Sequence, residues 1–122
     1  MKLLLVEDHM DTAQIYSRHL TLAGYEVLHT ASGLEALRWA RAQTFDVILI
    51  DLNLPDIDGS QVGLVLRDKL PNTPFIAMTS EDSRVTRKKT RFFGFDAFIT
   101  KPTTIALLLE TVNTVVVSKN KQ

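Results

Sequence analysis

The sequence has no cysteine, which excludes disulfide bonds and metal sites built on thiolates. It has no excess charge of either sign, because 14 basic and 14 acidic residues cancel, so its net charge favours neither nucleic acid nor anionic membrane. It also lacks a long apolar run: LLLV at 3–6 and VILI at 47–50 are far too short to span a bilayer. We therefore expect a cytoplasmic protein with local binding sites.

What the chain does contain is an alternation of short apolar segments with helical patterns. A length of 122 residues suits one domain, which we expect over 1–118, followed by a polar tail at 119–122. Strands are expected at 3–6, 25–29, 45–50, 75–78 and 97–99, and helices at 11–23, after Gly33, at 62–70, at 83–93 and after Pro102.

This alternation predicts the fold class. Three of the expected strands are apolar on both faces, which is typical of a parallel sheet covered by helices on both sides. Right-handed crossovers then favour a doubly wound α/β fold. We expect a flavodoxin-like, five-stranded parallel sheet in the order 2-1-3-4-5.

Four of the five expected strands are followed by residues that could bind a cation or a phosphoryl group. They are Glu7 and Asp8 after the first strand, Asp51 after the third, Thr79 after the fourth and Lys101 after the fifth. In a doubly wound sheet, ligands bind outside the carboxyl ends of the strands, where the strand order reverses. If the first and third strands are neighbours, the three carboxylates converge, and their mutual repulsion favours a divalent cation among them.

This patch has the composition of a phosphoryl-transfer site. An all-oxygen ligand set in a shallow, hydrated site favours Mg²⁺ over Ca²⁺. The ligands would be the carboxylates of Glu7, Asp8 and Asp51 and the backbone carbonyl of Asn53. Lys101 and the Thr79 hydroxyl would bind the remaining oxygens of a phosphoryl group. Asp51 is then the expected nucleophile and phosphoacceptor.

At these residues the chain resembles the receiver domain of two-component response regulators, in particular the stand-alone, chemotaxis-regulator-like members. The likeness rests on LLLVED at 3–8, DLNLPDIDG at 51–59, AMTS at 77–80 and FITKP at 98–102. The resemblance implies a signalling switch that catalyses only its own phosphoryl uptake and dephosphorylation. It also implies that a histidine kinase or histidine phosphotransfer protein is the donor, and that Asn53 and Glu81 flank the site.

The resemblance also suggests how the switch works. The family's hydroxyl residue, here Thr79, turns toward the phosphoryl group, and the aromatic residue three before the lysine, here Phe98, moves inward. The bond before Pro102 is commonly cis in that family, and such bonds mark tight turns. The signal would reach a protein partner, or a second copy of the chain, through the face formed by residues 83–118.

The expected helix at 83–93 is unusually basic. Its residues Arg84, Arg87, Lys88 and Arg91 recur at helical spacing on one face, and Phe92 stands beside them. This face is either solvated surface or a site for an acidic protein partner or self-association. We expect no nucleic-acid binding, because no helix-turn-helix segment follows.

Three other functions compete with the phosphorylation switch. A receiver-like scaffold would bind partners without phosphorylation. A nucleotide-binding module of the same fold would need a glycine-rich phosphate loop, which the chain lacks. A metal-dependent phosphatase would turn over external phosphoesters. His9 is most simply a loop residue without ligand function, and Asp56 and Asp58 are expected in turns and caps.

Overall fold

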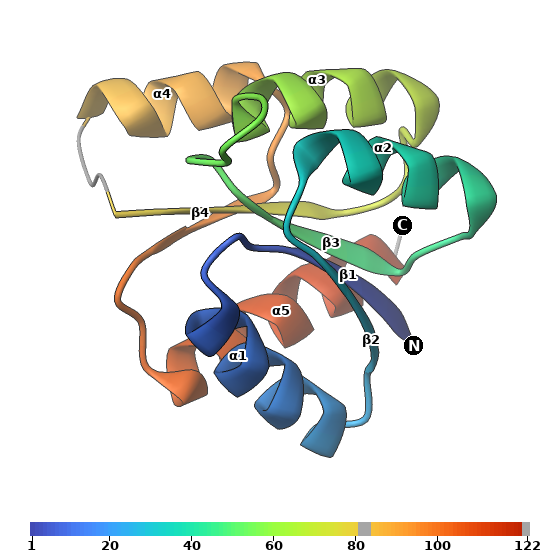
Figure 1. The fold of residues 1–122 in the computed structure, drawn as a ribbon, viewed down its shortest axis with the longest axis vertical. Coiled ribbons are helices and arrows are strands. Elements are labelled where there is room, and N and C mark those ends of the chain that lie inside the picture. The colour runs from blue at the N-terminus through green and yellow to red at the C-terminus, as the bar shows by residue number, and fades with distance from the viewer. Residues whose placement is uncertain (81–83, 121–122) are drawn as a thin grey trace.

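The apolar segments of the sequence form the strands of one sheet, and the helices lie between them in sequence (Figure 1). The computed structural model describes residues 1–80 and 84–120, with residues 89–92 and 120 described by their backbone only. The strands are β1 (Lys2–Val6), β2 (Glu26–Thr30), β3 (Val47–Asp51), β4 (Phe75–Thr79) and β5 (Ala97–Thr100). The helices are α1 (Met10–Leu22), α2 (Gly33–Ala42), α3 (Gly59–Lys69), α4 (Arg84–Phe92) and α5 (Ile105–Asn120).

The sheet has the predicted order, β2-β1-β3-β4-β5, and the pairs along it are parallel. Its centre is buried on both faces, since every residue of β3 and β4 is buried. The fold-class prediction is therefore confirmed. The order reverses between β1 and β3, so the carboxyl ends of these two strands flank the point where this fold class binds ligands.

Two hydrophobic clusters cover the two faces of the sheet. In Figure 1, α1 and α5 lie on one side of it and α2, α3 and α4 on the other. Alternate strand residues divide accordingly: Leu3 and Leu5 pack in the cluster with α1 and α5, and Leu4 and Val6 pack in the cluster with α2 and α3. Within the described residues, no helix is both long and apolar enough to cross a membrane.

The loop after β3 fixes the starts of two helices. Asp58 caps α3, because its carboxylate accepts a hydrogen bond from the Ser60 N–H at 2.9 Å. Asp56 instead reaches α2, where its carboxylate accepts from the Gly33 and Leu34 N–H groups and from the Ser32 hydroxyl. These N–H donors hold the pKa of Asp56 well below its ordinary value. Both aspartates thus have structural roles, as the sequence analysis expected.

The carboxyl end of the chain differs from the expectation. Helix α5 continues to Asn120, so residues 119 and 120 are helical instead of lying in a polar tail. The helix packs on the core here, since Val115 and Val116 are buried, and one turn later the ammonium group of Lys119 lies 3.5 Å from the carboxylate of Asp96. Ile15 on α1 and Leu34 on α2 recur at the apolar spacing of their helices, yet both are exposed.

Candidate functional site

Three charged residues that are far apart in the sequence meet at the carboxyl edge of the sheet. The ammonium group of Lys101, which follows β5, donates to Glu7 Oε1 at 2.7 Å and to Asp51 Oδ2 at 2.9 Å. Glu7 follows β1, and Asp51 is the last residue of β3. The parallel sheet therefore places two carboxylates around one cation, at the strand ends where the sequence analysis expected a site.

Asp51 is almost completely buried, with 1% of its surface exposed. Burial by itself disfavours the charged form of a carboxylate. Here hydrogen bonds from Glu7, from the Asn53 N–H at 2.9 Å and from Lys101 outweigh burial and lower the pKa of Asp51. The residue is thus an ionised carboxylate, held in place by these donors and shielded from bulk water.

Glu7 has the opposite electrostatic balance. It is fully buried, and burial together with the neighbouring Asp51 raises its pKa to about 7, against the opposing effect of Lys101. Because Glu7 and Asp51 share one cation, ionising both leaves an excess negative charge in a buried place. Near neutral pH, ionised Glu7 and Asp51 together carry more negative charge than Lys101 neutralises.

This balance predicts a pH effect on stability. In the unfolded chain Glu7 ionises near pH 4.5, whereas in the folded chain it keeps its proton until about pH 7. Its contribution to stability is thus present below pH 4.5 and lost as the pH rises toward 7. With a chelator present, Glu7→Gln should gain stability relative to wild type between pH 5 and 8, by on the order of 2 kcal/mol.

Urea unfolding at a series of pH values measures this difference. Glu26→Gln is the matched control, because Glu26 is exposed at the start of β2. The stability of this variant should change with pH as that of wild type does. If the free energy of unfolding of Glu7→Gln and of wild type changed with pH in parallel, the pKa of Glu7 would not be raised in the folded protein.

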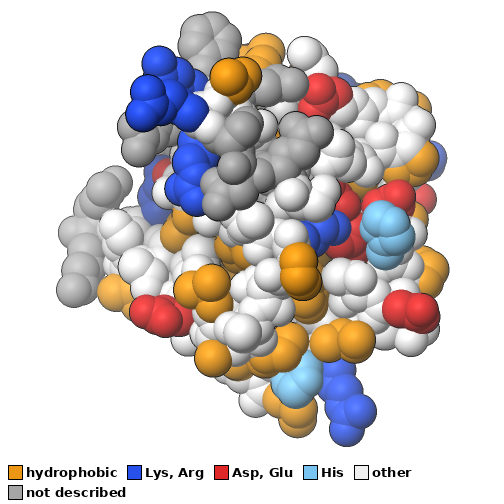
Figure 2. All heavy atoms as spheres, turned by 90° about the vertical axis from the view of Figure 1, so that its left-hand side faces the viewer, with side chains coloured by type: hydrophobic (Ala, Val, Ile, Leu, Met, Phe, Trp, Pro, Cys, Tyr) orange, Lys and Arg blue, Asp and Glu red, His pale blue; other side chains and the backbone are white. Residues whose placement is uncertain are grey.

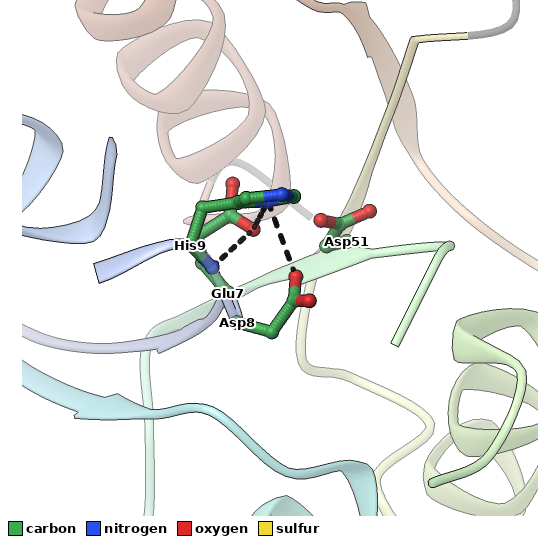
Figure 3. A group of neighbouring side chains, drawn as sticks. All are labelled: Glu7, Asp8, His9 and Asp51. Atoms are coloured by element: carbon green, nitrogen blue, oxygen red, sulfur yellow. Dashed lines mark hydrogen bonds and ion pairs between the residues drawn. The ribbon is translucent and has the colours of Figure 1, made fainter. Parts of the chain in front are cut away.

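Asp8 is the third carboxylate at this edge of the sheet, and we call Glu7, Asp8 and Asp51 together the acidic group. Its Oδ1 atom is buried and has no hydrogen-bond partner among the described residues. Figure 3 shows Glu7, Asp8 and Asp51 gathered around one space, with the His9 ring above it. Glu7, Asp8, His9 and Asp51 each offer one ligand atom, and these atoms all lie within 4.8 Å of one another. An unsatisfied buried carboxylate oxygen among further carboxylates fits a hard divalent cation.

The remaining expected site residues fall into two places. Thr79, at the end of β4, donates its hydroxyl to the Asn53 side-chain oxygen at 3.3 Å, so both border the acidic group. The Lys101–Pro102 peptide bond is cis. Phe98 lies apart from them, half-buried on β5, with the Arg87 guanidinium 5.0 Å from its ring centre.

The basic face lies on α4, and residue 83, where the sequence predicted this helix to begin, lies outside the described part of the chain. Arg84, Arg87 and Lys88 are exposed. The side chains of Arg91 and Phe92 lie outside the described part of the chain, as does Glu81. Figure 2 shows Lys and Arg side chains at the upper left of this view, and acidic side chains beside a histidine at its right.

Two histidines that were not expected at the site lie close to it. His9 Nδ1 lies 3.4 Å from Asp8 Oδ1. His29 Nε2 is 2.7 Å from the Glu7 backbone oxygen, so it donates there and holds the chain where β1 ends. The signal that could have indicated His29 is its position as the last residue of the second expected strand, 25–29; in the structure it stands opposite Leu5, near the edge where the acids converge.

Comparisons with known proteins agree with this geometry. Residues 3–113 match the family model of the response regulator receiver domain. The chain is 34% identical to the polar-differentiation response regulator DivK of Brucella ovis, over 89% of this chain and 90% of the relative.

Solved structures give the same result. Chemotaxis protein CheY4 of Vibrio cholerae is 34% identical, with a TM-score of 0.90 over 93% of this chain and 97% of that one. The receiver domain of the Pseudomonas aeruginosa sensor histidine kinase PA1611, solved with a magnesium ion coordinated in its active-site cleft, is 29% identical, with a TM-score of 0.87 over 94% and 96% of the two chains. The chain therefore belongs to the response regulator receiver domain family, the signalling switches of two-component systems.

Proposed function

We propose that this chain is a Mg²⁺-dependent phosphorylation switch, in the cytoplasm, whose phosphoacceptor is Asp51. The observation that carries the proposal is the state of that carboxylate. It is buried, its pKa is lowered, and Lys101 and the Asn53 N–H hold it from two sides. A nucleophile needs its charged form and a fixed orientation, and Asp51 has both.

The residues around Asp51 are suited to bind the Mg²⁺ ion that phosphoryl transfer requires. Glu7, Asp8 and Asp51 and the backbone carbonyl of Asn53 would hold Mg²⁺, and the buried Asp8 Oδ1, which accepts no hydrogen bond among the described residues, supports this assignment. The magnesium ion coordinated in the PA1611 receiver domain supports it independently. When bound, Mg²⁺ supplies positive charge to the phosphoryl oxygens.

The transfer itself uses the residues of this chain. An Asp51 carboxylate oxygen forms a bond to phosphorus as the bond from phosphorus to the donor's nitrogen or oxygen breaks, and the electron pair of that bond leaves with the donor. The donor is a phosphohistidine of a kinase or phosphotransfer protein, or a small acyl phosphate. Lys101 and the Thr79 hydroxyl are placed to bind phosphoryl oxygens.

The output follows from where the switch residues lie. Thr79 borders the site and pairs with Thr100 in the β4–β5 register. Phe98 lies two residues before Thr100 on the same strand. Movement of Thr79 toward the phosphoryl group would let Phe98 move inward and away from Arg87. The exposed cations Arg84, Arg87 and Lys88 suit an acidic protein partner or a second copy of this chain. We assign no role in nucleic-acid binding.

Intact-mass spectrometry after incubation with acetyl phosphate and Mg²⁺ tests the proposal. Wild type should gain one phosphoryl group that mild base removes, and Asp51→Ala should gain none. Asp68→Ala, which removes an exposed carboxylate on α3, should behave as wild type. No gain by a folded wild type that binds Mg²⁺ would refute the phosphorylation switch and leave a phosphorylation-independent scaffold.

A further inference from the structure

His9 has a position that packing and helix capping leave unexplained. It is the N-cap residue of α1, yet its side chain makes no capping hydrogen bond. The side chain is 70% exposed, so contacts with the core do not hold the ring. Instead the imidazole leans over the acidic group and turns Nδ1 toward the carboxylates of Glu7 and Asp8 (Figure 3).

We propose that His9 is a ligand of the cation held by this site, and that its nitrogen makes the site prefer first-row transition-metal ions such as Co²⁺ and Mn²⁺ over Mg²⁺. The inference rests on the cation site of the proposed function. It adds a nitrogen donor to a ligand set otherwise made of oxygens, and thereby changes which ion the site selects.

The distances from His9 Nδ1 to the neighbouring carboxylate oxygens are close to those between two ligand atoms of one metal ion. His9 Nδ1 lies 3.4 Å from Asp8 Oδ1 and 3.6 Å from Glu7 Oε2. Two ligand atoms bound at right angles to one cation, each about 2.1 Å from it, are separated by about 3 Å. A closure of a few tenths of an ångström would therefore bring the ring nitrogen and the Asp8 oxygen onto the same ion.

The chemistry of the donors sets the expected selectivity. Mg²⁺ prefers oxygen ligands and keeps several waters, so it gains little from an imidazole. Co²⁺ binds imidazole well and stands above Mn²⁺ in the order of divalent-metal affinities. The His9 nitrogen should thus strengthen Co²⁺ binding most, Mn²⁺ binding less and Mg²⁺ binding least.

The test is a set of metal titrations of the full, unphosphorylated chain at pH 8. Wild type, His9→Gln and the matched control His19→Gln are each titrated with Mg²⁺, Mn²⁺ and Co²⁺. His19 lies in the last turn of α1, well along the helix from His9 at its start, so its replacement should change nothing. Glutamine keeps a polar side chain of similar reach but replaces the nitrogen donor by an amide oxygen.

We expect His9→Gln to weaken Co²⁺ binding about tenfold or more and Mg²⁺ binding by less than about twofold. The visible absorption bands of bound Co²⁺ should shift in the same variant. Electron spin-echo measurements on bound Mn²⁺ should show a directly coordinated nitrogen in wild type that His9→Gln lacks. These readouts do not depend on phosphorylation.

Two results would overturn the inference and leave the proposed function intact. One is an unchanged preference among the three ions in His9→Gln. The other is an equal change for Mg²⁺ and Co²⁺, which would mean that His9 shapes the site without binding the ion through its nitrogen. A wild type that bound none of the three ions would count against the cation site itself, and so against the proposed function.

Discussion

Replacing Lys101 with methionine is expected to slow phosphoryl uptake from acetyl phosphate about 100-fold or more. The Lys101 ammonium group is the one cation bonded to both Glu7 and Asp51 among the interactions described, at 2.7 and 2.9 Å. Removing a positioned donor from a site where negative charge develops costs roughly this factor. The loss should appear as a slower gain of phosphoryl mass over time.

Methionine keeps the apolar stem of lysine, so the variant tests the charge more than the packing. Lys119→Met is the matched control: it also removes a cation that faces a carboxylate, Asp96, but that pair joins α5 to the loop before β5, at the other end of the strand. The control should take up phosphate at the wild-type rate. Equal rates in both variants and wild type would remove Lys101 from the transfer machinery.

The sheet order and the convergence of Glu7, Asp51 and Lys101 could be predicted because both follow from local patterns. Apolar periodicity defines the strands, and parallel topology then decides which strand ends meet. A residue at the carboxyl end of a strand, or directly after it, is positioned by the backbone of that strand. The residues that meet at the carboxyl edge are of this kind: Asp51 ends β3, and Glu7 and Lys101 directly follow β1 and β5.

Contacts made by side chains across loops could not be predicted in the same way. Asp56 caps α2, a helix that begins 23 residues earlier in the chain, and Lys119 in the last turn of α5 lies 3.5 Å from Asp96. His29 reaches the backbone of Glu7 from the neighbouring strand. Each of these contacts depends on how far apart two elements lie in the fold, and the periodicity of the sequence does not predict that distance.

Burial of individual helix residues was also only partly predictable. Ile15 is 53% exposed although it follows the apolar spacing of α1, because the buried positions of that helix are Ala13, Tyr16 and Leu20. Helical spacing defines an apolar stripe but not its width, which the packing of α1 against the sheet and α5 decides. An exposed apolar residue at the edge of such a stripe is ordinary for a soluble domain.

Gly59→Ala is expected to destabilise the protein by roughly 3 kcal/mol or more and to reduce phosphoryl uptake with it. A Cβ atom at Gly59 would lie 2.2 Å from the Asp51 backbone oxygen and 2.8 Å from Leu52 Cα, and backbone atoms cannot rotate away. The start of α3 would have to move off the segment that carries Asp51. Urea unfolding and the phosphoryl mass gain measure the two effects.

The neighbouring Ser60→Ala provides a matched control, because it creates the same residue one position later at the start of α3. Ser60 is buried, and its hydroxyl has no hydrogen-bond partner among the described residues, so removing it should leave stability within about 1 kcal/mol of wild type. Similar stabilities for both variants would show that the contact between Gly59 and Asp51 is loose. A large difference would instead mean that close backbone packing, as well as charge, positions the phosphoacceptor.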